Sequence, residues 1–374
     1  MTLRSRSESP ASSVLHVSDW VEGIEGDFPL NRAVAQSKET SLPPGSRAVS
    51  AESWGVSMWT NTAKLSTLGP SGEPREYFLK CSKGDSARAL TEGEYESAVA
   101  VNKVVPGLVP HPISWGRYDD NGVDTCFFLG AFRDMDFSEP PDPTELMARV
   151  AQLHQNSASP NGMFGFHVPT VIGRLERTVT WETTWAASFT HQLRDVIRYD
   201  NEANEPWPEF ELACDRLIEK VIPRVLGALQ SEGRELKPCL IHGDVWERNV
   251  GIDKKTGDPI LFDPGCTYAH NEMEFGTWRC SWAYYFNKPV YMRMYQKHIA
   301  PSPPAEEWDD RNRLYCIHSY ITASAGHPGR EYRKLAYNDV LYLCEKYAPL
   351  DTLPRYDPSL DVSLTGAYVP FVME

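Results

Sequence analysis

Residues 242–249 read HGDVWERN, and the apolar pair Leu240 and Ile241 stands directly before them. An apolar run that ends at a glycine and charged residues predicts a buried strand that opens into a loop. Asp244 and Asn249 lie five residues apart on that loop. The sequence therefore predicts a carboxylate and a side-chain amide close together at the end of a strand.

A second apolar run, residues 260–262, leads into Asp263. We expect a hairpin that brings two carboxylates and one amide oxygen to the same edge. Hard cations such as Mg²⁺ bind oxygen ligands and take several of them from phosphates and water. The order H-x-D-x-x-x-x-N, followed by an Asp on the next strand, is typical of kinase-type phosphoryl transfer. In that layout the first Asp orients or deprotonates a hydroxyl, and the Asn and the later Asp hold metal.

Each of these residues, taken alone, is better explained by a turn or a cap. As a set in this order and spacing, they favour a catalytic role. We expect Asp244 to be the catalytic base and Asn249 and Asp263 to be the magnesium ligands.

Lys80 ends an otherwise apolar strand, residues 77–80, and strand alternation places it on the same face as Phe78. A lysine on a partly buried face usually has an anionic partner. In kinase-like sites such a lysine binds nucleotide phosphates and is held by a glutamate of a helix. The helix expected at residues 87–105 offers three glutamates, of which only Glu94 lies on its apolar face. We therefore expect Lys80 to pair with Glu94. The rejected candidates are Glu92 and Glu96.

Residues 53–60, before the lysine strand, read SWGVSMWT. One glycine and several hydroxyl groups can form an anion-binding turn over phosphates. The segment has no G-x-G-x-x-G loop, and a pair of core strands explains it equally well. Both alternatives stay open.

The length of 374 residues suggests two domains or one large unit with two lobes. Strand-like segments and one helix precede Pro140, and after it the chain is mostly helical. A short helix is expected at residues 28–39, and Pro223 is expected to kink or split a later helix. The predicted fold class is α+β, with a small antiparallel-sheet lobe that has one helix and a larger, mainly helical lobe. The expected limits are a disordered tail at 1–15, the sheet lobe at 16–132 and the helical lobe at 133–374.

The net charge is −14, from 37 basic and 51 acidic residues. No stretch resembles the basic stripe that nucleic-acid binding needs, and an anionic membrane surface is disfavoured for the same reason. No apolar run reaches about 18 residues, and the N-terminal residues lack the apolar stretch of a secretory signal. Eight scattered cysteines without a C-x-x-C pair indicate reduced thiols and no structural zinc. We expect a cytoplasmic protein with neither nucleic acid nor membrane as a partner.

The residues around the predicted site resemble the fructosamine-3-kinase and ketosamine-3-kinase family. HGDVWERN looks like the family's HGD-[LV]-W-x-x-N segment. Residues 262–275, FDPGCTYAHNEMEF, are similar to its D-P-x-x-x-Y-x-H-x-E-x-E motif. Further matches are TEGEYESA at 91–98 and NGMFGFHVPTVIG at 161–173. The resemblance runs from about residue 53 to about residue 282 and implies a bilobal, protein-kinase-like and aminoglycoside-phosphotransferase-like fold.

The family precedent implies ATP and Mg²⁺ as cofactors and agrees with the roles expected above for the five polar residues. It also implies that a linker strand lies against adenine and that Trp246 lies beside the sugar, although Trp246 is also explained by packing on the loop. His270 and Glu272 would shape the acceptor site. Alternatively, they and Glu274 would support the residues of the site without contacting the substrate, and this supporting role is our default for Glu274. The linker residues are Leu129, Gly130 and Ala131.

The resemblance implies an ATP-dependent kinase that phosphorylates the 3-hydroxyl of a ketosamine, on a protein lysine or a small amine, and so leads to deglycation. A DPG segment in place of DFG and the lack of an APE segment argue against a protein kinase. One alternative is a kinase of the same fold for another amino sugar or amino alcohol. A second is a pseudokinase that binds a nucleotide without catalysis. The sequence leaves open the preferred sugar, the free or protein-bound state of the amine and the oligomeric state.

Overall fold

The computed structural model describes residues 14–15, 42, 45–55, 57, 59–120 and 123–371. It divides into two compact units. The first holds Met1–Tyr95 and His111–Arg133, and the second holds Glu96–Pro110 and Asp134–Glu374. The helix expected at 28–39 and most of the tail expected at 1–15 lie outside the described residues, and the predicted lobe limits stay a prediction.

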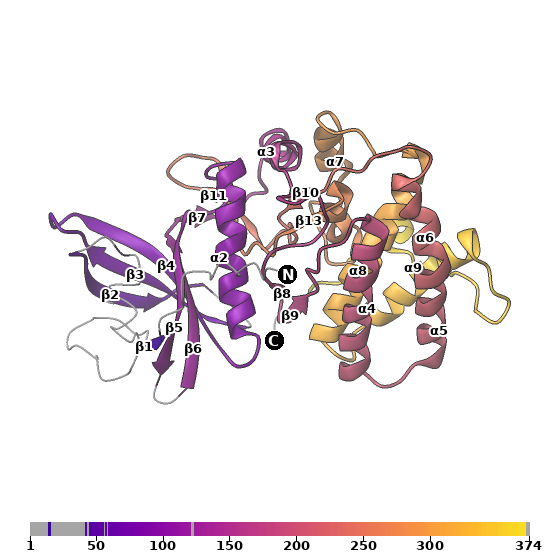
Figure 1. Cartoon of the computed structure of the whole chain (residues 1–374), viewed down its shortest axis with the longest axis horizontal. Helices are drawn as coiled ribbons and strands as arrows, with labels where there is room; N and C mark the ends of the chain where they lie inside the picture. The colour runs from indigo at the N-terminus through magenta and orange to yellow at the C-terminus, as the bar shows by residue number, and fades with distance from the viewer. Residues whose placement is uncertain are drawn as a thin grey trace, which may run out of the picture. The chain divides into compact units, whose positions relative to one another are not determined.

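The first unit is built on a six-stranded sheet in the order β1-β5-β6-β4-β3-β2 (Figure 1). Neighbouring strands pair antiparallel, except that β1 pairs parallel with β5. The strands are β1 (Val14–Leu15), β2 (Arg47–Ser53), β3 (Asn61–Leu68), β4 (Pro74–Lys83), β5 (Pro112–Asp120) and β6 (Val123–Ala131).

Alternation along the strands gives this sheet its core. Ala63 and Leu65 of β3 are buried, and the residues between them are more exposed, because successive side chains of a strand point to opposite faces. They pack in one cluster with Leu79 of β4 and with Phe127 of β6. The turn between β3 and β4 closes at Gly69, whose N–H donates to the carbonyl of Glu73 at 2.8 Å.

Helix α2 (Ala87–Val104) confirms the helix expected at 87–105. Its first half belongs to the first unit and its second half to the second. In the second unit, Ala98 and Val101 are buried in a core cluster that also contains Leu240 and Leu261. The apolar residues that flank the predicted catalytic loop are therefore packed against the end of α2.

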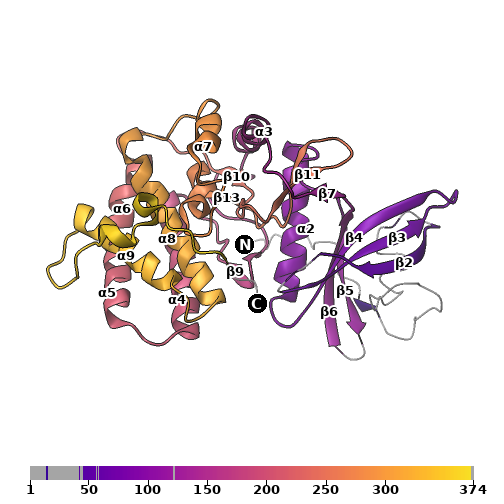
Figure 2. The ribbon, with the colours of Figure 1, turned by 180° about the vertical axis from the view of Figure 1, so that it is seen from behind.

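The second unit is mainly helical (Figure 2). Its helices are α3 (Pro143–Asn156), α4 (Trp185–Ala203), α5 (Pro208–Arg216), α6 (Ile222–Val225), α7 (Pro289–Gln296), α8 (Trp308–Gly326), α9 (Tyr332–Tyr347) and α10 (Val362–Thr365). Its strands are β7 (Met135–Asp136), β8 (Thr170–Ile172), β9 (Leu175–Arg177), β10 (Cys239–Ile241), β11 (Val250–Asp253), β12 (Pro259–Leu261) and β13 (Thr267–Ala269).

Helix α8 lies at the centre of this unit and packs against α4, against α9 and against the 3₁₀ segment Asn271–Arg279. Large side chains such as Tyr315 and Tyr320 are fully buried along it. The prediction for Pro223 is confirmed, because a π-helical turn, Leu217–Val221, separates α5 from α6 just before the proline.

An antiparallel sheet in the first unit and a helical second unit confirm the predicted α+β fold class. Every helix among the described residues is too short or too polar to span a membrane. All eight cysteines lie in the described part of the chain, and each is buried and without a disulfide. Burial raises the pKa of thiols such as Cys239 and Cys266.

Candidate functional site

In the first unit, Lys80 of β4 and Glu94 of α2 form a buried ion pair. Their Nζ and Oε2 atoms are 2.7 Å apart, and only 6% and 8% of the two side chains are exposed. The competing glutamates have other contacts, Glu92 with Arg88 and Glu96 with His167. The predicted pairing is confirmed, because the structure joins Lys80 to the glutamate on the apolar face of the helix.

The linker residues predicted to face adenine lie on β6, next to the lysine strand. Leu129 pairs with Leu79, Gly130 with Phe78 and Ala131 with Tyr77. Their linker role and the adenine contact both stay predictions.

The segment at residues 53–60 forms the connection between β2 and β3. Gly55 has a φ of 76°, which favours glycine, and the N–H of Trp54 donates to the carbonyl of Thr62 at 3.0 Å. Thr62 pairs with Lys80 across β3 and β4, so this turn lies at the lysine end of the sheet. Residues 56 and 58 of the segment lie outside the described part of the chain.

In the second unit, the loop after β10 joins Asp244 to Asn249. Asn249 Nδ2 donates to Asp244 Oδ2 at 2.8 Å and to the Asp244 carbonyl at 3.1 Å. Strands β11 and β12 pair antiparallel, and the N–H of Phe262 donates to the Asn249 carbonyl at 3.0 Å. Asp263 follows directly, so the predicted meeting of these three residues at one end of a hairpin is confirmed.

Asp263 is exposed and has a φ of 55°, in the left-handed region that residues with side chains rarely adopt. Such backbone strain is concentrated at functional sites. Burial of Asp244, together with the nearby charge of Asp263, raises the pKa of the Asp244 carboxyl to about 7, while the charge of Arg177 opposes this shift. A pKa near neutrality suits a general base.

The turn at Gly243 is held by side chains that hydrogen-bond to its backbone. Glu274 accepts hydrogen bonds from the N–H groups of His242 at 2.7 Å and of Gly243 at 2.8 Å, and His154 lies 3.3 Å from its carboxylate. Arg177 Nη2 donates to the Gly243 carbonyl at 3.2 Å. Glu274 therefore supports the loop from behind, in line with our default for it.

Gly243 has a φ of 85°, and a Cβ there would collide with the backbone carbonyl of Gly265. Only a glycine fits this turn without a shift of the backbone at Gly265. His154 and Arg177, which also hold the turn, were not expected from the sequence, since neither belongs to a motif that we recognised.

The rest of the loop after β10 is also fixed by hydrogen bonds and packing. The Val245 carbonyl accepts from Trp278 Nε1 at 2.8 Å, and Glu247 Oε1 accepts from three successive backbone N–H groups. Those groups belong to Tyr284, Tyr285 and Phe286. Trp246 is half-buried and its ring packs edge-on against Phe371, with 5.3 Å between the ring centres.

His270 and Glu272 are buried away from solvent in the helical unit. His270 contacts the hydroxyl of Tyr315 at 2.8 Å, and its pKa is lowered to about 4 by burial. Glu272 Oε2 accepts from Arg311 Nε at 2.7 Å. His270 and Glu272 are 0% and 2% exposed. Of the two alternatives for them, the structure favours support of the site over contact with the acceptor.

Asn249 and Asp263 fit a magnesium ion. Among the residues that the structure describes, no group of three or more His, Cys, Asp and Glu side chains is placed to hold a metal. Magnesium does not need one, because it keeps several waters and binds substrate phosphates with one or two protein carboxylates. Asn249 uses Nδ2 toward Asp244, which leaves Oδ1 for a cation.

The Fructosamine kinase family model matches residues 60–342 of the chain. The protein-ribulosamine 3-kinase, chloroplastic, of Oryza sativa subsp. japonica is 28% identical over 246 residues. That match covers 66% of this chain, and the chain spans 66% of the length of the rice protein.

Two solved structures share the fold. A "putative fructosamine-3-kinase" of Haemophilus somnus 129PT has a TM-score of 0.61 at 15% identity, covering 79% of this chain and 92% of that one. A thermostable mutant of an aminoglycoside phosphotransferase has a TM-score of 0.50 at 15% identity, covering 80% and 94%. The latter was solved as a ternary complex with AMP-PNP and hygromycin B.

Proposed function

The chain belongs to the fructosamine kinase family, and on that premise we propose that it phosphorylates the 3-hydroxyl of a ketosamine at the expense of ATP. The single observation that carries this proposal is the hairpin end where Asp244, Asn249 and Asp263 meet. The buried pair of Lys80 and Glu94 in the first unit supports it.

Each residue has a defined task in this reaction. Asp244 accepts the proton of the sugar hydroxyl or aligns that hydroxyl for attack on the γ-phosphorus. Asn249 and Asp263 would hold Mg²⁺, which neutralises charge on the phosphates. Lys80 would bind nucleotide phosphates, and Glu94 fixes its ammonium group through a 2.7 Å contact. Little covalent chemistry falls to the protein, so positioning and electrostatics dominate.

The acceptor is a sugar bound to an amine. The name of the rice relative supports a ribulosamine, and the family name supports a fructosamine. Loss of the phosphorylated sugar from the amine would make the biological role deglycation. The ATP analogue bound to the phosphotransferase neighbour supports ATP as the donor.

The predicted cytoplasmic location remains a prediction. The name of the rice relative places that protein in the chloroplast. The expected lack of nucleic-acid and membrane partners likewise rests on charge and hydropathy alone.

Mass spectrometry tests the proposal. Ribulosyl-lysine and fructosyl-lysine are incubated with the protein, ATP and magnesium, and Asp244→Asn serves as the matched control. One phosphoryl group gained with the natural protein and none with the control supports the proposal and ranks the two sugars.

If neither ketosamine gains a phosphoryl group, the proposed ketosamine kinase activity is wrong. Aminoglycosides and amino alcohols in parallel reactions then test the alternative acceptor. A thermal-shift titration with Mg-ATP tests the pseudokinase alternative, which predicts stabilisation without turnover of any acceptor.

A further inference from the structure

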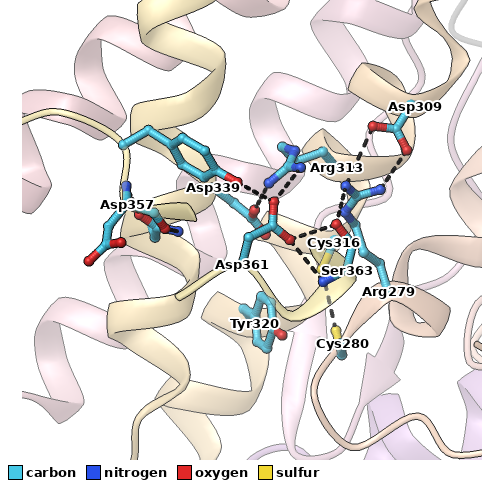
Figure 3. A network of polar contacts seen from close by, with 12 residues as sticks. Arg279, Cys280, Asp309, Arg313, Cys316, Tyr320, Asp339, Asp357, Asp361 and Ser363 are labelled. Atoms are coloured by element: carbon cyan, nitrogen blue, oxygen red, sulfur yellow. Dashed lines mark hydrogen bonds and ion pairs between the residues drawn. The ribbon is translucent and has the colours of Figure 1, made fainter. Parts of the chain in front are cut away.

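Residues 361–371, which we call the C-terminal strap, are anchored at their first residue. Asp361 is 3% exposed and caps α10. Its carboxylate accepts from Arg313 Nη2 at 2.8 Å, from the hydroxyl of Tyr356 at 2.5 Å and from the N–H of Ser363 at 2.8 Å. Figure 3 shows the contacts of Arg313 and Ser363 converging on Asp361. A buried, fully hydrogen-bonded carboxylate fixes this end of the strap.

Arg279 reinforces the anchor. Its Nη2 donates to the Ser363 hydroxyl at 3.0 Å, and its Nη1 binds Asp309 at 2.7 Å (Figure 3). Further along the strap, the N–H of Val369 donates to the carbonyl of Ser281 at 2.9 Å.

The other end of the strap, Phe371, is surrounded by aromatic side chains. Phe371 packs against four aromatic side chains, with ring centres 4.8 to 5.8 Å apart. These are Trp246, Trp282, His327 and Tyr332. The Phe371 carbonyl also accepts from Arg248 Nη2 at 3.3 Å. The strap therefore docks directly on two residues of the loop between Asp244 and Asn249.

This docking constrains the side chain that the family precedent places beside the sugar. The ring of Trp246 meets Phe371 edge-on, and the guanidinium of Arg248 lies 5.8 Å from the centre of the same ring. The Trp246 carbonyl accepts the N–H of Asn249 at 3.0 Å. A shift of Phe371 would therefore displace both the ring of Trp246 and the loop that carries Asn249, the predicted metal ligand.

We propose that the C-terminal strap forms one wall of the acceptor site, with Phe371 as the positioning residue that holds the ring of Trp246, and that this wall selects free ketosamines over glycated lysines of folded proteins. The inference rests on the proposed function. A sugar on a protein lysine extends from the protein surface by only a four-carbon side chain. That surface would have to pass the strap, whose Leu364 and Tyr368 side chains are 68% and 54% exposed.

Kinetics with Phe371→Ala test the inference, with free ribulosyl-lysine and ribulosylated lysozyme as substrates. We expect the KM for ribulosyl-lysine to rise about tenfold with kcat nearly unchanged, because the ring of Trp246 is still present but is less well held. The ratio of kcat/KM for the free adduct to that for the protein adduct should fall. Phe371→Tyr, which keeps an aromatic ring at position 371, should restore both the KM and the substrate ratio.

Leu212→Ala is the matched control, since it removes an exposed leucine side chain of α5, outside the strap and the loop. An unchanged KM in Phe371→Ala, the same change in Leu212→Ala or an unchanged substrate ratio would each overturn the inference.

If the natural protein phosphorylates neither substrate, the proposed function fails, and hydrogen exchange decides on the strap. Faster exchange of the Asn249 amide in Phe371→Ala, but not in Leu212→Ala, supports positioning of the loop by the strap. Equal exchange in both variants contradicts it.

Discussion

Replacement of Glu274 by Gln tests how the catalytic turn is held. The buried carboxylate accepts from two backbone N–H groups, at 2.7 and 2.8 Å, and the amide can accept only one of them. Burial by itself would raise the pKa of Glu274, but contacts with His154 and with the backbone lower it overall, so the charged form is the native one. A hydrogen bond to a charged group contributes about 1.5–3 kcal/mol, so we expect a loss of about 2–3 kcal/mol in the free energy of unfolding.

The effect on catalysis should match the effect on stability in free energy, since a 100-fold loss of rate corresponds to about 2.7 kcal/mol. The two N–H groups belong to His242 and Gly243, so their rearrangement moves the backbone next to Asp244. A displacement of about 1 Å at a catalytic group can cost about 100-fold in rate. We therefore expect kcat to fall by about two orders of magnitude, measured by coupled assay of ADP release at saturating substrates.

Glu272→Gln is the matched control. Glu272 lies two residues away on the same 3₁₀ segment and is equally buried, but its partners are the guanidinium of Arg311 and the N–H of Ser302, both outside the catalytic turn. Loss of the charge should lower the free energy of unfolding by about 3–5 kcal/mol and leave kcat and the acceptor KM nearly unchanged. The reasoning is refuted if Glu274→Gln keeps its kcat within about twofold, or if both variants lose kcat equally. A raised acceptor KM in Glu272→Gln would instead restore its predicted contact with substrate.

The other predictions concern the ion pair, the metal and pH. Lys80→Met should remove the ammonium group that contacts the buried Glu94 carboxylate and lower the free energy of unfolding by about 3–5 kcal/mol. It should also remove thermal stabilisation by Mg-ATP, and unchanged stabilisation would contradict the phosphate role. Asp263→Ala should abolish activity or sharply raise the magnesium concentration at half-maximal rate, and an unaltered metal titration would assign the ligand elsewhere. Burial lowers the pKa of His270 to about 4 and of His318 to about 3, below the unfolded value of about 6.5. The unfolded chain then binds more protons below pH 6.5, so each histidine contributes a loss of about 2 kcal/mol in the free energy of unfolding between pH 6.5 and pH 5, whereas the raised pKa of Asp244 contributes in the opposite direction. Urea unfolding of His318→Gln should therefore show a smaller loss over this range than the natural protein, and an equal loss in both would refute this.

The features that were predictable from sequence are local or have a fixed spacing. Helix α2 follows from apolar residues at helical intervals, and the pairing of Lys80 with Glu94 follows from which helix face carries the glutamate. The hairpin that carries Asp244, Asn249 and Asp263 follows from two short apolar runs beside polar residues.

The remaining contacts join segments that no local pattern links. Arg177 reaches Gly243 across 66 residues, and His154 reaches Glu274 across 120. Phe371 reaches the loop through its ring against Trp246 and its carbonyl toward Arg248, from a segment with no regular spacing of apolar residues. His270 and Glu272 carry the chemistry of a binding site, but only the packing of α8 shows that both are enclosed.

The eight buried cysteines make unfolding directly measurable by chemistry. An alkylating reagent reacts with the thiolate, which is both shielded and disfavoured in the folded protein, so labelling proceeds through opening of the structure. Cys81 and Cys126 belong to the first unit, and the other six belong to the second. The masses that appear during pulsed alkylation would therefore tell which unit opens first and how fast, without a single substitution. The same arrangement makes the native chain resistant to thiol oxidants until one of its units opens.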